Sequence, residues 1–303
     1  MDINSLIINK FCPICNSEKI QDKNEIQSKH NEINLLFSLK KCLDCNHRFL
    51  SKFPTEQYLE KLYKDNSKYV FSHEFHENYE KNKFKEEGFE KVKSFKEHWI
   101  FNFVDINKSG EYLEIGPGLC GLYKTFHEKK WHCEGLDLQP FIKAPGIVDN
   151  LEKIKNNSKD VAVALDVIEH SIDPDKFLKN INNKLKINGK MFLTFPNSDS
   201  FKSKILNNRW DMVVPLAHLN FFSKKSIKIS LENNNFKLTY IKNYSLVDPK
   251  RFFKNLIKLP LKLLKDLIFL NFLSFFNRLK EMLITFFDMI NGDQMMVVAE
   301  KVK

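Results

Sequence analysis

Four cysteines near the N-terminus have the spacing of metal ligands. Cys12 and Cys15 form one C-x2-C pair, and Cys42 and Cys45 form a second pair after an interval of 26 residues. Two thiolates three positions apart on a tight turn can meet one tetrahedral ion, and two such turns supply four sulfur ligands. We therefore predict a closed, structural Zn²⁺ site, with a pair of redox-active dithiols as the alternative.

The residues that follow each pair fit this interpretation. Asn16 and Asn46 come directly after the second cysteine of their pairs, where the turn often needs a positive φ that asparagine tolerates. His47 is a spare candidate ligand, but four sulfur atoms already satisfy the ion. We expect the metal to hold together about 50 residues that are too poor in apolar side chains to fold alone.

A glycine-rich stretch carries the second candidate site. Gly116, Gly118 and Gly121 form a G-x-G-x-x-G pattern directly after an apolar run, within YLEIGPGLCGLYKTF. Gly116 and Gly118 let the backbone approach a ligand closely, and Gly121 lets the next helix pack on the sheet. Asp137 follows Gly116 by 21 residues, where a carboxylate can accept hydrogen bonds from a ribose diol. This pattern fits a dinucleotide and other nucleotide cofactors equally well.

Three features disfavour a dinucleotide. Glu114 stands two residues before the first glycine, where its carboxylate would repel a pyrophosphate but attract a cation such as the ammonium of an amino-acid moiety. Pro117 stiffens the loop, and no strand–helix–strand unit precedes it. Cys120 is the unusual residue, because a small, permissive residue is expected in the middle of such a loop.

The apolar pattern indicates the elements that must position these residues. After Gly110, short apolar strands alternate with helical segments, which predicts a parallel sheet with helices on both faces. Ligands bind beyond the carboxyl ends of such strands. The helices that we expect span 121–128, 174–185 and 224–233, the last with Ser223 as its N-cap. The expected strands span 112–115, 133–138, 147–149, 161–167, 190–195, 237–244 and 295–301.

Together these motifs resemble the class I S-adenosylmethionine-dependent methyltransferases, in particular those of ubiquinone biosynthesis, natural products and surface sugars. The matching pieces keep the family's order: LEIGPGLCGL, GLDLQP, VAVALDVIEHSIDPDKFL, LKINGKMFLTFPN and LAHLNFFSKKSI. They cover residues 95–246 plus the final strand. The resemblance implies an α/β fold with a seven-stranded, Rossmann-like sheet that is mostly parallel, with an antiparallel last strand in GDQMMVVAEK.

The resemblance also implies which residues hold the cofactor. Those at the methionine part of S-adenosylmethionine would be Glu114, Gly116, Gly118, Asp166 and Val167. Those at its adenosine part would be Asp137 and Leu138, by the ribose hydroxyls, and Asp149, by the adenine amino group. Cys120 stands where the family usually has glycine. We expect a tolerated substitution there rather than a catalytic thiol.

Methyl transfer needs an acceptor aligned behind the sulfonium methyl. An oxygen acceptor gains from a base such as histidine, and a carbon acceptor usually requires one. The candidates are Glu169 and His170, beyond the fourth strand, and His218 in PLAHLNFF. The chain is also similar to sugar carbon-methyltransferases with an N-terminal four-cysteine module, in which the matching Glu-His pair is thought to act at the substrate. The pair could equally order its loop, and His218 could be structural.

Composition narrows the classes of partner. The 303 residues are 43% hydrophobic, and the net charge of +10 is spread along the chain rather than gathered in one basic block, so nucleic acid is not the favoured partner. The N-terminus lacks the pattern of a signal peptide, and we find no run of 18 apolar residues. We expect a cytoplasmic protein, with peripheral contact at the inner membrane surface as a further option.

That option rests on an insertion before the last strand, residues 249–291. Its stretch 251–290 holds eight Phe, seven basic and three acidic residues, and we expect amphipathic helices broken near Pro260. They could form an extra helical layer or a homodimer face. Alternatively, they form an interfacial membrane element that brings the active site to a lipid-linked acceptor.

The expected organisation has four parts: a zinc-ribbon module (1–52), a helical linker (53–108), a methyltransferase domain (109–248 and 292–303) and the amphipathic insertion (249–291). Apolar residues at helical spacing, from Phe84 to Phe103, predict two or three helices in the linker. His73, His76 and Tyr79 are interpreted as side chains of those helices.

The predicted function is methyl transfer from S-adenosylmethionine to oxygen or carbon of a small-molecule, sugar, glycan or lipid-linked acceptor. A non-catalytic binding protein of the same fold, with the zinc module recruiting a partner, is the alternative. A nicotinamide oxidoreductase is a more distant one, disfavoured by Glu114 and the later motifs.

Overall fold

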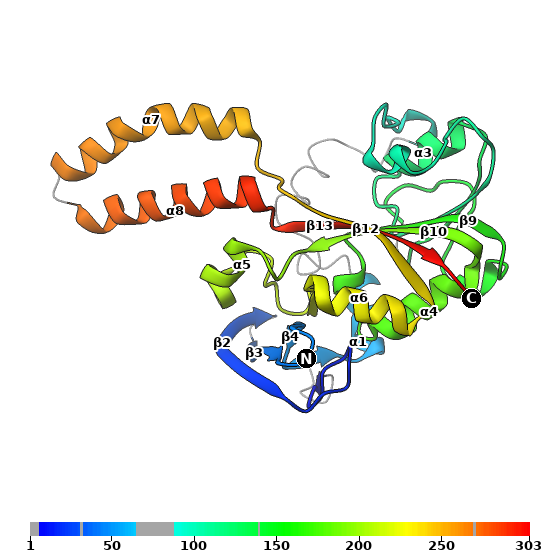
Figure 1. Ribbon diagram of the computed structural model, residues 1–303, viewed down its shortest axis with the longest axis horizontal. Coiled ribbons are helices and arrows are strands. Elements are labelled where there is room, and N and C mark those ends of the chain that lie inside the picture. Colours follow the sequence, from blue (N-terminus) through cyan, green and yellow to red (C-terminus); the bar gives the residue numbers. More distant parts are fainter. Residues whose placement is uncertain (1–5, 31–32, 65–87, 139, 269–270) are drawn as a thin grey trace.

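The computed structural model describes residues 6–30, 33–64, 88–138, 140–268 and 271–303 (Figure 1). Its centre is a seven-stranded sheet in the order β12-β13-β10-β9-β6-β7-β8. β6 to β10 run parallel, whereas β13 is antiparallel to both of its neighbours. The predicted fold is confirmed. The strands are β6 (Glu111–Ile115), β7 (His132–Leu136), β8 (Ile147–Val148), β9 (Lys159–Leu165), β10 (Leu185–Pro196), β12 (Phe236–Tyr244) and β13 (Gln294–Lys301).

Helices cover both faces of this sheet. Tyr112 and Leu113 are neighbours on β6, so their side chains point to opposite faces, and each belongs to a different buried cluster. The Tyr112 face is covered by α3 (Gly121–Glu128), and the Leu113 face by α4 (Pro174–Lys184) and α6 (Lys224–Asn233). Ser223 caps α6 through the backbone N–H of Ser226, which confirms the predicted N-cap.

The four-cysteine module packs against the Leu113 side of the sheet. β1 (Leu6–Ile8) pairs with β5 (Lys52–Pro54), and a second sheet joins β2 (Ile20–His30), β3 (Ile33–Cys42), β4 (Arg48–Leu50) and β11 (Asn220–Phe221). β11 comes from the segment after β10, so one strand of the module's sheet is supplied by a part of the chain far from the module in sequence. Phe37 and Phe49 of the module and Phe221 are all buried in the same cluster.

The linker is less helical than predicted. It begins with α1 (Glu56–Lys64), but from Gly88 onward its helical structure is confined to 3₁₀ turns at Phe89–Lys91 and Trp99–Asn102. The expected helix is therefore wrong in this part, because the backbone of Phe95 hydrogen-bonds the Thr125 side chain of α3 instead of its own chain. His73, His76, Tyr79 and Phe84 lie outside the described residues.

The insertion is a pair of long helices, α7 (Pro249–Ile268) and α8 (Phe272–Asn291), separated by a short connection after Ile268. The predicted break near Pro260 is wrong, since α7 continues through it. Proline removes one helical hydrogen bond, and the carbonyl left over belongs to Leu256, which is exposed and can bond water. α5 (Phe201–Leu206) packs against α8. Over the described residues, neither these helices nor any other has the length and apolar content needed to cross a membrane.

Candidate active site

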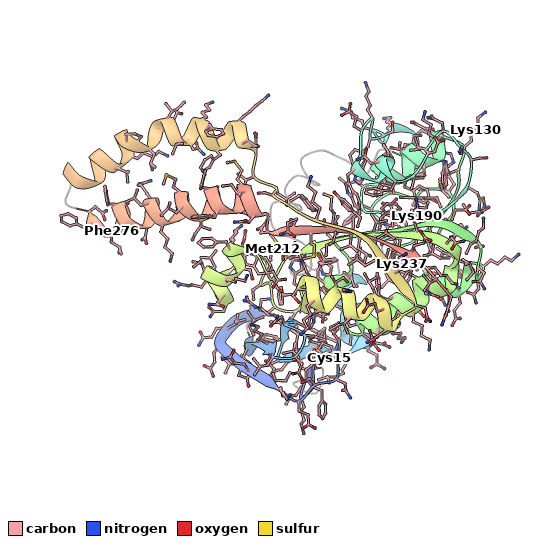
Figure 2. The ribbon with its side chains drawn as sticks, in the orientation of Figure 1. Cys15, Lys130, Lys190, Met212, Lys237 and Phe276 are labelled. Carbon is pink, nitrogen blue, oxygen red and sulfur yellow. The ribbon has the colours of Figure 1, made fainter. Side chains whose placement is uncertain are left out.

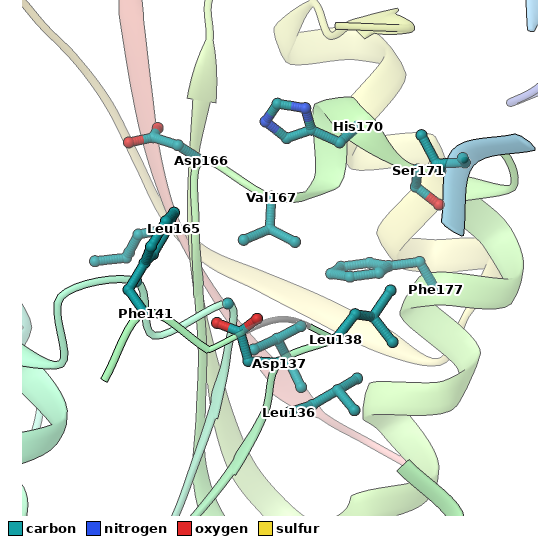
Figure 3. Close-up of a pocket in the computed structure, with 14 residues that line it drawn as sticks. Leu136, Asp137, Leu138, Phe141, Leu165, Asp166, Val167, His170, Ser171 and Phe177 are labelled. Carbon is teal, nitrogen blue, oxygen red and sulfur yellow. The ribbon is translucent and has the colours of Figure 1, made fainter. Parts of the chain in front are cut away.

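A cavity of about 300 Å³ lies at the carboxyl ends of β6, β7 and β9. Figure 3 shows the side chains that converge on it. Seven of the predicted site residues line it, and they come from three strand ends: Gly116 and Gly118; Asp137 and Leu138; Asp166, Val167 and His170. The structure thus brings together residues that are up to 54 positions apart in the sequence, because parallel strands end at one edge of the sheet.

The glycine loop needs its glycines. Gly116 has φ +66°, and a Cβ there would lie 3.0 Å from Cγ2 of Val167. Gly118 has φ +51°, with open space where its Cβ would be. Both positions therefore require a left-handed backbone, and at Gly116 a side chain would also press on the opposite wall of the cavity.

Cys120 occupies the third left-handed position of this loop, with φ +58°. It is fully buried, directly before α3. Burial raises the pKa of its thiol to about 12, so the thiol is protonated and unreactive at neutral pH. The raised pKa agrees with a residue that does not need to react, whereas the left-handed φ is a conformation that glycine adopts more easily than cysteine.

Apolar side chains enclose the Asp137 end of the cavity. Leu136, Phe141 and Phe177 line it beside Asp137 (Figure 3), and Leu59 of α1 lines it from the linker. A carboxylate among aromatic and aliphatic walls suits a nucleoside, whose base is apolar and whose ribose offers hydroxyl donors. The sequence analysis missed these walls. Phe177 lies one turn before Ile181, a spacing that indicates core packing as readily as a binding site.

Asp166 stands at the end of β9 with φ +55°. Its backbone N–H donates to the Thr194 carbonyl at 2.9 Å, and the Thr194 hydroxyl donates to its carboxylate at 2.9 Å. Its side chain is exposed at the cavity, and partial desolvation by the surrounding protein raises its pKa. Thr194 on β10 therefore fixes a carboxylate at the mouth of the site.

Two predicted cofactor residues do not line the cavity. Glu114 is 5% exposed and lies behind the glycine loop, where the Tyr112 hydroxyl donates to its Oε2 atom at 2.7 Å. Burial raises the pKa of Glu114 to about 8. Strand alternation explains the position, since Glu114 shares the face of Tyr112, whereas Ile115, on the opposite face, lines the cavity. The expected contact of Glu114 with the methionine part stays a prediction.

Asp149 is the second such residue. It follows β8 at the surface, and its Oδ1 atom accepts a hydrogen bond from Lys153 Nζ at 2.6 Å. It is absent from the residues that line the cavity. Val148 of β8 pairs with Leu136 of β7, so Asp149 follows its strand at the same level as Asp137, and its position by the adenine amino group stays a prediction.

The three predicted catalytic side chains meet in space. Glu169, His170 and His218 each offer a nitrogen or oxygen atom, and these atoms lie within 4.8 Å of one another. The two imidazole rings are 4.8 Å apart between centroids. Each histidine is oriented by a backbone carbonyl: His170 Nδ1 by Ala217 at 2.9 Å, and His218 Nδ1 by Met212 at 2.7 Å.

Those carbonyls determine the tautomers. A carbonyl oxygen only accepts, so the Nδ1 atom of each neutral ring carries the proton and Nε2 keeps its lone pair. Burial lowers the pKa of His170 to about 3 and also lowers that of His218, whereas burial raises the pKa of Glu169. The Oε2 atom of Glu169 is buried without a hydrogen-bond partner among the described residues. Two unprotonated nitrogens and one orphaned carboxyl oxygen therefore lie together, and His170 is the member of this group that lines the cavity.

The four-cysteine module contacts the segment that carries His218. Asn220 accepts from His47 Nε2 at 3.1 Å and donates to the Ser171 carbonyl at 2.6 Å, directly after the Glu169–His170 pair. The Ser223 hydroxyl donates to the Cys45 carbonyl at 3.0 Å. The sequence analysis missed Asn220, because nothing local to its position indicates a partner 173 residues away.

The geometry of the four cysteines fits a tetrahedral ion. Sγ atoms of Cys12 and Cys45, and of Cys15 and Cys42, are 3.5 Å apart, and all four lie within 4.8 Å of one another. All four cysteines are free thiols. Zn–S bonds of about 2.3 Å require sulfur separations close to these. Asn16 and Asn46 have φ +55° and +61°, as predicted, and His47 packs away from the ion position against Asn220.

Comparison with known proteins places this geometry in context. The family model described as "Methyltransferase domain" matches residues 84–241, slightly more than half of the chain. No curated protein matches.

Solved structures with a similar fold include two S-adenosylmethionine-dependent methyltransferases, from Archaeoglobus fulgidus (15% identity over 67% of this chain and 91% of that one, TM-score 0.45) and Mesorhizobium loti (10% identity, 67% and 95%, TM-score 0.45). A third is Haemonchus contortus phosphoethanolamine N-methyltransferase 2, in complex with phosphomonomethylethanolamine and S-adenosylhomocysteine (17% identity, 92% and 72%, TM-score 0.47).

Proposed function

The chain belongs to the methyltransferase-domain family and is an S-adenosylmethionine-dependent methyltransferase, and from this premise we propose that it methylates oxygen or carbon of a sugar, glycan or lipid-linked acceptor. Glu169, His170 and His218 are the proposed catalytic groups. The observation that carries the proposal is their convergence: two separate loops bring their polar atoms within 4.8 Å of one another, and His170 of this group lines the cavity. A lipid-linked acceptor would also require contact with a membrane surface, for which residues 250–290 are proposed.

The cavity fits the cofactor. Asp137 is placed to accept from ribose hydroxyls, Leu138 and Phe141 to contact the base, and Gly116 and Gly118 to let the backbone approach the amino-acid part. When bound, S-adenosylmethionine supplies a methyl group on a positively charged sulfur. Asp166, held by Thr194, would face the cationic end of that ligand, and the attraction would lower its raised pKa.

The histidines are suited to take a proton from the acceptor. His170 Nδ1 is occupied by the Ala217 carbonyl, so its Nε2 atom is the base. A carboxylate at Glu169 would stabilise the imidazolium that forms at His170 and raise the low pKa of this ring, and the proton that the ring takes up is the one that the acceptor loses on methylation. His218 is oriented in the same way and positions the acceptor or assists the transfer.

The four cysteines are proposed to hold one structural Zn²⁺. Four sulfur ligands leave the ion no open position, so its role is to fix the module. In this proposal the module in turn supports the His218 segment through Asn220 and Ser223.

The test is transfer of labelled methyl from S-adenosylmethionine into glycan and lipid extracts of the source organism. Label recovered in the organic phase assigns a lipid-linked acceptor, and label in the aqueous glycan fraction assigns a free sugar or glycan. His170→Gln should abolish incorporation while leaving the affinity for S-adenosylhomocysteine unchanged in calorimetric titration. His127→Gln, at an exposed position outside the site, is the matched control. Wild-type incorporation by His170→Gln would remove this residue from the mechanism.

A further inference from the structure

We propose that the α7–α8 hairpin is an interfacial anchor that binds the surface of an anionic lipid membrane. The hairpin extends away from the body of the molecule (Figure 1), and Phe276 lies near its far end (Figure 2). α7 packs mainly on α8, and α8 contacts the body through α5 and β12. Much of both helices is therefore left uncovered.

An apolar stripe runs along the uncovered side of α8. Its members recur at three-, four- and seven-residue intervals, which places them on one face of a helix. Phe276 is 64% exposed and Ile290 is 61% exposed. The full stripe consists of Phe272, Phe276, Leu283, Phe287 and Ile290. Phe287 also contacts Phe201 of α5, with ring centroids 4.5 Å apart, so the stripe begins where the hairpin leaves the body.

α7 adds apolar and basic side chains in adjacent rows. Phe253, Leu256 and Ile257 are exposed, with Ile257 at 79%. Beside them, exposed lysines recur every four residues and form one row: Lys250, Lys254, Lys258 and Lys262. Among the described side chains of the two helices, Glu281 is the exposed acidic one, so the exposed surface of the hairpin combines apolar side chains with an excess of positive charge.

That combination matches the interface of an anionic membrane. An apolar face can enter the boundary between headgroups and acyl chains, while long lysine side chains reach the phosphates beside it. A second copy of this chain fits less well. In a two-fold dimer the same face meets itself, and the lysine row would then face a second positive surface.

A close backbone contact at the base of the hairpin restrains the direction in which the two helices leave the body. Gly292 has φ +69°, and a Cβ there would lie 2.4 Å from the Tyr244 carbonyl oxygen. The chain therefore crosses itself closely where β12 leads into α7 and α8 leads into β13. Because β12 and β13 are strands of the central sheet, membrane contact by the hairpin would orient the catalytic sheet relative to the lipid surface.

The experiment measures co-sedimentation of the full-length protein with vesicles of phosphatidylcholine, with and without phosphatidylglycerol. We expect binding to the anionic vesicles that weakens as salt is added. Replacing the most exposed apolar residues by serine should abolish it: Ile257, Leu273, Phe276 and Ile290. Replacing the lysine row by glutamine should weaken the partition coefficient by roughly fivefold per lysine.

Two matched controls carry the same chemical changes elsewhere. One replaces exposed apolar residues of the body by serine: Ile8, Leu43 and Ile187. The other replaces exposed body lysines by glutamine: Lys224, Lys225, Lys228 and Lys237. Both should bind vesicles as the wild type does, and all variants should retain the affinity for S-adenosylhomocysteine.

Three results would overturn the proposal: absence of vesicle binding by the wild type, equal weakening in the control variants, or a dimer in light scattering that the serine variant abolishes while vesicle binding is absent. The last result would assign the face to a second copy of the chain. The vesicle measurement uses no acceptor and no turnover, so its outcome is independent of whether the proposed acceptor class is correct.

Discussion

The Nε2 atom of His47 lies 3.1 Å from the Oδ1 atom of Asn220, and this contact joins the four-cysteine module to the loop of the proposed catalytic histidines. His47 is fully buried, and burial lowers its pKa to about 3, so its ring is neutral and its Nε2–H donates. The side-chain amide of Asn220 makes two hydrogen bonds: its Oδ1 atom accepts from His47, and its Nδ2 atom donates to the Ser171 carbonyl. One side chain thus holds the module and the Glu169–His170 turn in a fixed relation.

Asn220→Ala is predicted to lower both stability and turnover. It leaves the buried donor of His47 and the Ser171 carbonyl without a partner, which costs about 1–3 kcal/mol of unfolding free energy per group. We expect kcat to fall, with the affinity for S-adenosylhomocysteine retained, as measured by denaturation, kinetics and calorimetry. Asn208→Ala is the control, since this amide donates at the surface to the Glu25 carbonyl. A wild-type kcat in Asn220→Ala would show that the contact between the module and this loop does not influence turnover.

Zinc removal is predicted to act at the active site as well as on the module. Metal analysis should give one zinc per chain, and chelation should destabilise the protein and reduce methyl transfer, because Cys45 and His47 support the segment that carries His218. Added zinc should restore both properties. Cys42→Ser should behave like the chelated protein, whereas Cys133→Ser, at a buried cysteine outside the cluster, should keep its zinc. Full activity in a zinc-free, oxidised protein would favour the redox dithiols.

Local patterns were sufficient for most of the fold. The strands and helices after Gly110 follow from apolar runs and caps such as Ser223, and the zinc knuckles from cysteine spacing with asparagine at the positive-φ positions. The prediction of helices in the linker was wrong for the described part after Gly88. The aromatic residues there pack on α3 through turns, and the backbone N–H of Phe95 donates to the Thr125 hydroxyl. A helical spacing of apolar residues does not reveal which backbone groups will be used elsewhere.

The site residues that could be predicted are those at the carboxyl ends of the parallel strands. Gly116, Asp137 and Asp166 line the cavity because each ends or follows a parallel strand at the same edge. For Glu114 the charge suggested a ligand contact, but the sequence did not reveal the hydrogen bond that it accepts from the Tyr112 hydroxyl. Asn220 could not be found at all, because its role exists only once the module and the sheet are packed together.

Gly116→Ala is predicted to impair cofactor binding more than Gly118→Ala does. Both variants force alanine into a left-handed backbone, which costs about 1–2 kcal/mol, but only at Gly116 does the new Cβ approach Val167, at 3.0 Å. The wall of the cavity must then shift. Calorimetric titration with S-adenosylhomocysteine should show a loss of at most about thirtyfold for Gly118→Ala and a clearly larger loss for Gly116→Ala. Equal affinities would show that the contact with Val167 is unimportant.

The stability of the protein is predicted to fall as pH rises from 6.5 toward 8, and Glu114 should account for much of this loss. Its pKa rises from 4.5 to about 8 on folding, so the folded state holds an extra proton between these values and loses that advantage as pH increases. His47 and His170 act in the opposite sense, because their pKa values fall from 6.5 to about 3. Their contribution is complete above 6.5 and is lost only as pH falls below it.

Glu114→Gln separates these effects. Glutamine can still accept from the Tyr112 hydroxyl but cannot ionise, so the variant should lack the Glu114 part of the decline between pH 6.5 and 8, a difference on the order of 2 kcal/mol in unfolding free energy. Urea denaturation of wild type and variant at the two pH values measures it. Glu152→Gln, at an exposed carboxylate, should keep the wild-type profile. If Glu114→Gln kept that profile too, the buried carboxyl would have to be ionised at both pH values, and its burial behind the glycine loop would need another compensating charge.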